Sequence, residues 1–163
     1  MKKSKNIYGY KDFSTWKWRN FDGTEEVSID DYVQKNRDRV FIIGTDSQNY
    51  RGASKCTFTS MLIAYNPGRG GTAILHKNTV PYMDNLRQRL LMEAMRSLEL
   101  AWHVDAQIDS ESVLTIHLDV NDSLKYKSGR YRDELVGLIV AQGFNARVKP
   151  DAWGASQVAD LKC

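Results

Sequence analysis

The succession of hydrophobic patterns is the feature that most constrains the fold of this 163-residue chain. Three segments of strand character come first, separated by short turns, at residues 39–47, 56–66 and 72–80. A helical period of 3.6 begins only afterwards, over residues 81–105. Because successive strands joined by short loops usually pair with one another, these segments predict an antiparallel meander followed by a long helix.

Strands and helices alternate in the rest of the chain. Residues 112–121 alternate between apolar and polar side chains, which indicates a fourth strand. A helix is predicted over 128–143, with Gly143 at its C′ position, then a short strand over 144–150 and a short helix over 152–162. Right-handed crossovers would add the later strands to the same sheet in parallel orientation. The pattern therefore predicts an α/β fold.

The N-terminal part differs in character from the rest. Residues 1–38 are expected to form a basic and aromatic extension with a short helix capped by Ser28, and residues 39–163 the folded domain. The first 20 residues carry six Lys or Arg and one Asp, a charge of +5, within a chain whose net charge is +3. Interleaved cations and aromatic rings are typical of nucleic-acid contact. The rings could equally pack on the domain while the lysines stay in solvent, and the sequence leaves both readings open.

Composition excludes several classes of protein. No apolar run approaches the ~20 residues that span a bilayer, and no apolar segment follows the basic N-terminus as a secretory signal would require. The two cysteines, Cys56 and Cys163, provide neither a disulfide framework nor zinc-ligand spacing. We therefore expect a cytoplasmic protein that does not bind membranes, while the sequence gives no indication of its oligomeric state.

Two aspartates follow apolar strand segments. Asp46 comes directly after the apolar run that begins at Phe41, and Asp119 lies near the end of the predicted strand 112–121. If these two strands are parallel neighbours, both carboxylates emerge at the same edge of the sheet. An ionised aspartate there is costly unless it is paired, hydrogen-bonded or bound to a metal.

Two further acids are candidates for the same place. Helix geometry sets Glu93 on the flank of the apolar stripe, directed toward the sheet, and Glu99 on the polar face beside Arg96. Asp160 belongs to the last predicted helix, whose small residues permit close approach to the sheet. Converging carboxylates repel one another unless divalent cations bind between them, and oxygen ligands favour Mg²⁺ or Mn²⁺.

The motifs "IGTDSQ", "HLDVN", "KYKSG" and "AWGASQVAD" resemble the ribonuclease H-like superfamily, and within it the YkuK family of predicted nucleases. The resemblance covers roughly residues 40–160. It implies a ribonuclease H-like α/β domain over residues 39–163, with a five-stranded mixed sheet of order 3-2-1-4-5 flanked by helices. It also implies two-metal hydrolysis of phosphodiesters, with two Mg²⁺ or Mn²⁺ ions. The implied catalytic residues and metal ligands are Asp46, which would bridge both ions, Glu93, Asp119 and Asp160.

Polar residues near these acids are candidates for substrate binding. Ser47 and Gln48 could hydrogen-bond a phosphate or a sugar hydroxyl, and simple loop chemistry explains them equally well. Lys125, Lys127 and Arg130 follow Asp119 and could contact a nucleic-acid backbone, or form a solvated face that caps the next helix. A neighbouring histidine, His117, is better explained as a structural residue.

The leading hypothesis is a metal-dependent nuclease that hydrolyses phosphodiester bonds of RNA, DNA or an RNA–DNA hybrid. The alternative is a catalytically weak or inactive nucleic-acid-binding module on the same fold. The sequence indicates neither the substrate nor whether cleavage is internal or terminal.

Overall fold

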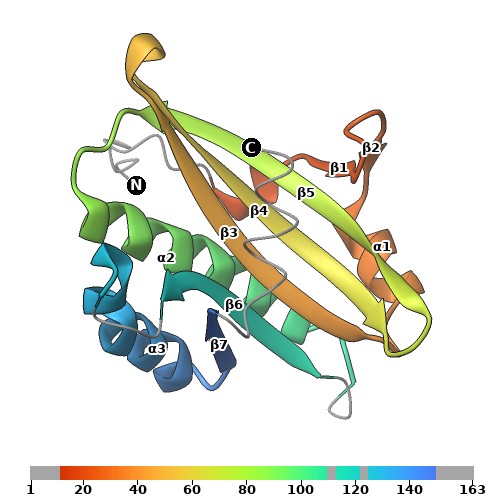
Figure 1. The fold of residues 1–163 in the computed structure, drawn as a ribbon. Coiled ribbons are helices and arrows are strands. Elements are labelled where there is room, and N and C mark those ends of the chain that lie inside the picture. The colour runs from red at the N-terminus through yellow and green to blue at the C-terminus, as the bar shows by residue number, and fades with distance from the viewer. Residues whose placement is uncertain (1–11, 110–112, 122–124, 150–163) are drawn as a thin grey trace, which may run out of the picture.

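The structure is a computed structural model, and it describes residues 12–109, 113–121 and 125–149 (Figure 1). A central sheet carries three α-helices and three 3₁₀ turns among these residues. The strands are β1 (Trp18–Asn20), β2 (Glu26–Val27), β3 (Val40–Tyr50), β4 (Lys55–Asn66), β5 (Gly70–Pro81), β6 (Leu114–Asn121) and β7 (Asn145–Lys149). The helices are α1 (Ile29–Lys35), α2 (Leu86–Asp105) and α3 (Arg132–Ala141), and the 3₁₀ turns are η1 (Phe13–Thr15), η2 (Arg51–Ala53) and η3 (Lys127–Tyr131).

The seven strands form one sheet in the order β2-β1-β5-β4-β3-β6-β7. The prediction of a five-stranded sheet is wrong, and the full strand order differs from the predicted one, because β1 and β2 extend the sheet beyond β5. From β5 onward the strands follow as β5-β4-β3-β6-β7, with an antiparallel meander and two parallel pairs, β3 with β6 and β6 with β7. The sheet is therefore mixed.

The N-terminal segment is built into the sheet. Strand β1 pairs antiparallel with β5, with Arg19 opposite Leu75. Trp16, just before β1, and Trp18, its first residue, are 6% and 2% exposed and belong to the main hydrophobic core. For these two rings, packing on the domain was the correct reading. The lysines and tyrosines of residues 1–11 lie outside the described residues.

A tight hairpin joins β4 and β5, where the sequence predicted a short turn, through the residues "PGRGG" at 67–71. Gly68 and Gly70 have φ angles of +78° and +80°, which glycine adopts at little cost. Gly71 serves a different purpose, since a Cβ there would lie 2.6 Å from the Ala64 carbonyl oxygen. The hairpin thus depends on glycine both for backbone conformation and for close strand approach.

Helix α2 begins later than the sequence predicted. Pro81 is the last residue of β5, and the helix starts at Leu86 after Asn85, whose side chain accepts a hydrogen bond from the Gln88 amide. Asparagine at this position satisfies one of the free amides of the first turn. The inward face of α2 buries Leu90, Ala94, Leu98 and Ala101 against the sheet, together with Leu100 and Val104.

The other predicted helices are also present in part. Ser28 caps α1 through a hydrogen bond from the Asp31 amide at 3.3 Å. The helix predicted over 128–143 is a 3₁₀ turn, η3, followed by α3, and Gly143 follows its C-cap with a φ of +85°. That conformation is the usual helix C′ geometry. The helix predicted over 152–162 lies outside the described residues.

Helices α2 and α3 pack on the same face of the sheet, as Figure 1 shows. Residues of β3 and β6 at alternate positions face them: Phe41, Ile43, Ile116 and Leu118. The intervening residues face the other side, where Ile42 joins a smaller cluster with Met61 and Ile63. Among the described residues, no helix combines the length and the apolar character that crossing a bilayer requires.

Candidate functional site

Asp46 and Asp119 lie on neighbouring parallel strands. The pairing of β3 with β6 runs from Phe41 opposite Leu114 to Gly44 opposite His117. The pairing ends there, and Asp46 and Asp119 each lie two residues further along their strands. The parallel arrangement that the sequence analysis required is therefore present.

Both aspartates are directed to the face of the sheet opposite α2. Side chains alternate along a strand, and the residues next to each aspartate face the helices: Thr45 and Ser47 contact α2, and Leu118 and Val120 belong to the helix-side core. Asp46 is 8% exposed. Its strand was predicted to end near Asp46, and this is wrong. Strand β3 continues to Tyr50, paired with β4 throughout.

A row of hydroxyl groups follows β3 on the helix side. The Ser97 hydroxyl donates to Thr45 Oγ1 at 2.9 Å, and Thr45 and Ser60 hydroxyl oxygens are 3.0 Å apart. One step further, Ser47 Oγ donates to Glu93 Oε1 at 2.5 Å. These bonds fasten α2 to β3 at the level of the aspartates.

Glu93 is directed toward the sheet, as predicted, and is 7% exposed. Its pKa is raised from 4.5 to about 8, chiefly by burial and in smaller part by the negative charge of Asp119. The Ser47 hydrogen bond and the positive charge of Arg89 act in the opposite direction. The influence of Asp119 on this pKa places the two carboxyls within electrostatic range of each other.

Asp119 forms an ion pair with the last described residue of the chain. Lys149 Nζ lies 2.5 Å from Asp119 Oδ1, and the Asp119 side chain is 18% exposed. Lys149 ends β7, the strand next to β6. Its ammonium group supplies positive charge beside a carboxylate that the sequence analysis assigned to a metal ion.

The residues described by the structure contain no group of three or more His, Cys, Asp or Glu side chains able to hold a metal ion. Asp160, the fourth predicted ligand, lies outside the described residues. The structure thus places Asp46 and Asp119 on one face of the sheet and Glu93 on the other, with Glu93 within electrostatic range of Asp119. The complete ligand set stays a prediction.

The sequence profile of the ribonuclease H-like family matches residues 26–162. The chain belongs to this family. It is also 29% identical over 149 residues to the "Uncharacterized protein YkuK" of Bacillus subtilis (strain 168), a match that covers 79% of this chain and 83% of that protein. No solved structure matches the chain. Both parts of the resemblance inferred from the sequence motifs are confirmed.

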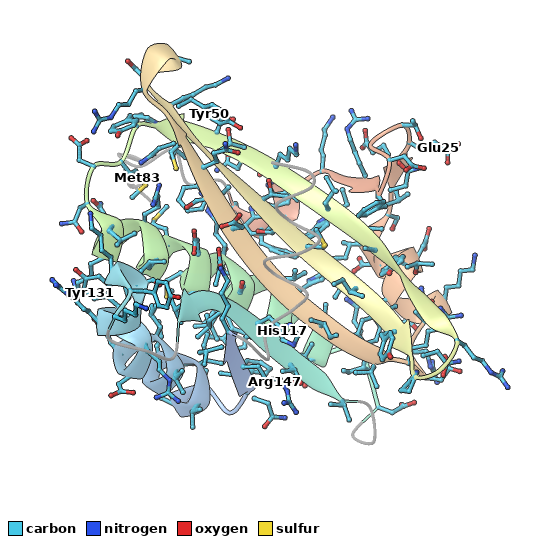
Figure 2. All side chains as sticks on the ribbon, in the orientation of Figure 1. Glu25, Tyr50, Met83, His117, Tyr131 and Arg147 are labelled. Carbon is cyan, nitrogen blue, oxygen red and sulfur yellow. The ribbon has the colours of Figure 1, made fainter. Side chains whose placement is uncertain are left out.

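The ribonuclease H-like domain also buries a histidine beside Asp119. His117 is 2% exposed, and burial, with the nearby charge of Arg147, lowers its pKa to about 4. His117 and Arg147 are paired residues of β6 and β7 (Figure 2). A neutral, buried imidazole agrees with the structural role preferred for it.

The predicted substrate-binding residues lie in two places. Ser47 is engaged with Glu93, and Gln48 Oε1 accepts a hydrogen bond from the Tyr50 hydroxyl at 3.0 Å. Lys125, Lys127 and Arg130 are exposed, at and just before η3. Their roles stay predictions, although Ser47 now has a specific contact that a loop residue would lack.

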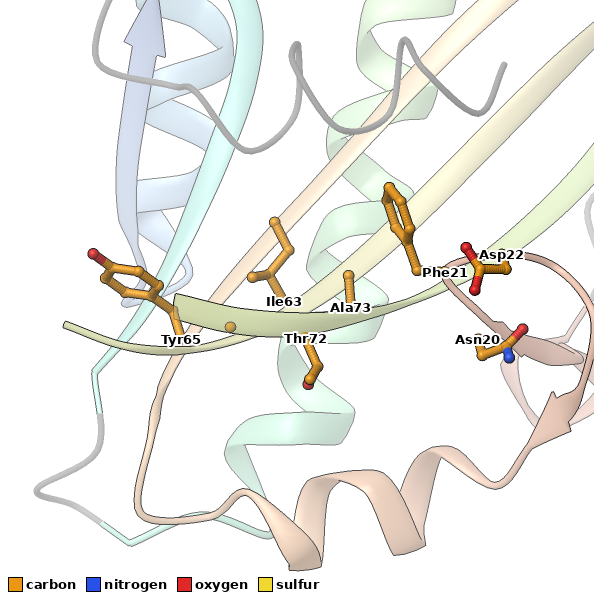
Figure 3. Close-up of a pocket in the computed structure, with 8 residues that line it drawn as sticks. Asn20, Phe21, Asp22, Ile63, Tyr65, Thr72 and Ala73 are labelled. Carbon is orange, nitrogen blue, oxygen red and sulfur yellow. The ribbon is translucent and has the colours of Figure 1, made fainter. Parts of the chain in front are cut away.

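A cavity of about 580 Å³ lies beside β4 and β5, near the hairpin that joins them and next to the residues that follow β1 (Figure 3). Its lining is mainly apolar and consists of Phe21, Ile63, Tyr65 and Ala73, with Asn20 and Asp22. Asp46 pairs with Thr59, four residues from Ile63 along β4, which is about 13 Å of strand. The cavity is therefore separate from the acids.

Sequence reasoning missed two contacts that define the candidate site. The Ser47–Glu93 bond joins residues 46 positions apart, and the Lys149–Asp119 pair depends on the register of β7. The Ser47–Glu93 bond had a signal in the sequence. Because side chains alternate along a strand, Thr45 and Ser47 must face the side of the sheet opposite to that of Asp46. The Lys149–Asp119 pair had no such signal, since register across a parallel pair cannot be read from periodicity.

Proposed function

We propose that this ribonuclease H-like protein is a metal-dependent nuclease, a phosphodiester hydrolase acting on RNA, DNA or an RNA–DNA hybrid in the cytoplasm. The observation that carries the proposal is that Asp46 and Asp119 lie on one face of neighbouring parallel strands, each two residues beyond the last paired residues. Glu93, whose pKa responds to Asp119, approaches from the helix side. Family membership supports the same reaction class.

The chemistry of these residues fits divalent cations. Carboxylate oxygens are ligands that Mg²⁺ and Mn²⁺ prefer. The raised pKa of Glu93 reflects a buried carboxyl held near other negative charge, a situation that a bound cation reverses. We propose that Asp46, Glu93, Asp119 and Asp160 would hold the ions.

Each described residue has a separate task in this proposal. Asp46 and Asp119 hold negative charge on the substrate side of the sheet, and the Ser47 hydroxyl orients the Glu93 carboxyl. Lys125, Lys127 and Arg130 contact the phosphate backbone, and Gln48 contacts the phosphate or sugar next to the bond that is cut. Two bound divalent ions would supply activation of the attacking water and stabilisation of the leaving oxygen.

The test is cleavage of a panel of labelled RNA, DNA and hybrid oligonucleotides with Mg²⁺ or Mn²⁺ by the wild type and by Asp46→Asn. We expect the substitution to reduce cleavage at least about 100-fold, the scale seen when a key electrostatic group is removed from an active site. Circular dichroism and a thermal melt show that the variant is folded. Equal cleavage by both proteins would reject the proposal.

One observation favours the alternative, a nucleic-acid-binding module with weak or no activity. The Lys149 ammonium group at 2.5 Å from Asp119 competes with any cation for that carboxylate. Isothermal titration with Mn²⁺ separates the two functions. Wild-type protein that binds an oligonucleotide but takes up no Mn²⁺, and cuts none of the panel, would establish the binding module.

A further inference from the structure

A second concave surface lies on a different side of α2 from Glu93. Glu99 comes six residues after Glu93, which is about 9 Å along the helix and about 120° around it. It lines a cleft of about 730 Å³ between η1, α1 and α2. Phe13, Asp30, Trp102, His103 and Gln107 complete most of the lining.

Two carboxyl groups stand in this cleft, and one of them is held in place. Asp30 Oδ1 is 2.6 Å from His103 Nε2 and accepts a hydrogen bond from Gln107 Nε2 at 3.0 Å. The proximity of His103 lowers the pKa of Asp30, so this residue is ionised at neutral pH. The Asp30 carboxylate is therefore held at one wall of the cleft by His103 and Gln107.

The second carboxyl group lacks a partner. Glu99 Oε2 is a buried atom with no hydrogen-bond donor in reach among the described residues. Burial raises the pKa of Glu99 to about 7, so a nearby cation would favour its ionised form. A buried acceptor without a donor is costly, and a bound donor would remove that cost.

Aromatic rings provide the remaining walls. Trp102 is 45% exposed, which is unusual for so large an apolar side chain. Phe13 packs against the His103 ring with centroids 4.7 Å apart. Met95, one turn of α2 before Glu99, is also 43% exposed and extends the apolar surface beyond the cleft. Aromatic faces beside carboxylates are a favourable environment for a cation.

We propose that this cleft binds the guanidinium group of an arginine side chain presented by a partner protein. Arginine is favoured because its planar fork of donors can serve Asp30 and Glu99 while its flat face stacks on Trp102. A protein is favoured because exposed Met95 offers apolar contact to residues that flank the arginine. This binding is independent of the nuclease proposal, since Glu99 and Glu93 lie on different sides of α2.

The experiment is an NMR titration of the full-length ¹⁵N-labelled protein at pH 8 with three acetylated and amidated tripeptides. Their central residue is arginine, citrulline or lysine between glycines. The arginine peptide should shift the Trp102 indole resonance, assigned by Trp102→Phe, in a saturable manner at millimolar concentrations. Citrulline keeps the shape without the charge and should bind at least about tenfold more weakly, because charge-assisted hydrogen bonds are roughly twice as strong as neutral ones.

Two variants complete the test. Glu99→Gln should weaken arginine-peptide binding several-fold, whereas Asp133→Asn, whose side chain is 93% exposed on α3, should leave it unchanged. A thermal melt identifies any unfolded variant, and Asp30→Asn then replaces Glu99→Gln in the comparison. Equal binding of arginine and citrulline peptides, or of the wild type and both cleft variants, would overturn the proposal. Lysine binding as tight as arginine binding would overturn its arginine specificity.

Discussion

Helix α2 carries two glutamates, Glu93 and Glu99, on different sides. Burial raises the pKa of both carboxyls, but their surroundings differ. Glu93 faces the sheet, where a Ser47 hydroxyl donates to it and Asp119 lies nearby. Glu99 faces the cleft beside Trp102, with one carboxyl oxygen unpartnered among the described residues. The pKa values are raised to about 8 and about 7, respectively.

The difference shows that a raised pKa by itself does not identify a catalytic carboxyl. Burial is the largest cause for both residues, and only Glu93 has a second acid among its causes. A like charge close by is the feature typical of metal and catalytic sites, where it is retained despite its cost. The nuclease proposal therefore rests on the neighbours of Glu93 and not on its burial.

The strongest test of this comparison is Glu93→Gln beside a substitution elsewhere on the same helix. We expect Glu93→Gln to lower cleavage at least about 100-fold, because an amide cannot supply the charge of a carboxylate. Exposed Asp105, at the end of α2, is the matched control, and Asp105→Asn should keep wild-type activity. Similar activity in both variants would remove Glu93 from the site.

The next largest expected effect is the loss of oligonucleotide affinity when the basic residues around η3 are replaced. Replacing Lys125, Lys127 and Arg130 together by glutamine should weaken binding of an oligonucleotide about tenfold or more. The slope of log affinity against log salt should become shallower by up to about 3, because each of the three cations can neutralise one phosphate. Fluorescence anisotropy in the Asp46→Asn background measures binding without cleavage.

A control for the basic residues removes two exposed cations from other surfaces, Lys35 and Arg69. If this double variant changes the salt slope as much per charge as the η3 variant, the binding is a general charge effect. The η3 surface would then lose its assigned role.

The Ser47–Glu93 hydrogen bond should have a moderate effect. Ser47→Ala removes the donor, so the free energy of unfolding should fall by about 1 kcal/mol. Cleavage should fall several-fold, because the Glu93 carboxyl is less well oriented. Urea denaturation and steady-state kinetics measure the two effects. Ser14→Ala, which alters an exposed hydroxyl bonded to Asp12, is the control and should change stability by less than about 0.5 kcal/mol.

The smallest expected effect is the contribution of Glu99 to the pH dependence of the free energy of unfolding. The folded-state Glu99 pKa of about 7 exceeds the ordinary value of 4.5, so the folded protein binds this proton more tightly than the unfolded chain does. The resulting stability is present below pH 4.5 and is lost as the pH rises through 7. After discounting for solvent screening, about 1 kcal/mol is expected.

Urea denaturation at several pH values between 4.5 and 8 measures this contribution in the wild type and in Glu99→Gln. The stability of the wild type should decline more steeply with increasing pH than that of the variant. Parallel stability profiles would show that Glu99 is solvated as an ordinary surface residue.

The two glutamates also show how far sequence reasoning reached. Helical projection placed Glu93 inward correctly, because the apolar stripe of α2 is continuous. The same projection placed Glu99 and Arg96 on the polar face. For Arg96 this is wrong, whereas Glu99 is half-buried and lines an open cleft. Arg96 is 1% exposed, with its guanidinium carbon 4.8 Å from the Phe58 ring centroid and 5.8 Å from that of Trp16. Trp16 of the N-terminal segment packs over this side of α2. A helical projection considers one helix alone and cannot predict contacts with another segment.

The sequence by itself determined the local elements of this protein: strand and helix periods, the Ser28 cap, the glycine hairpin and the family motifs. These features depend on contacts between residues close in the chain or on patterns that repeat along it. Tertiary structure decided the rest. The addition of β1 beside β5, the sharing of one face by Asp46 and Asp119, and the cover over α2 each depend on register and packing between distant segments. Such contacts are selected by the burial of whole surfaces and not by any local pattern.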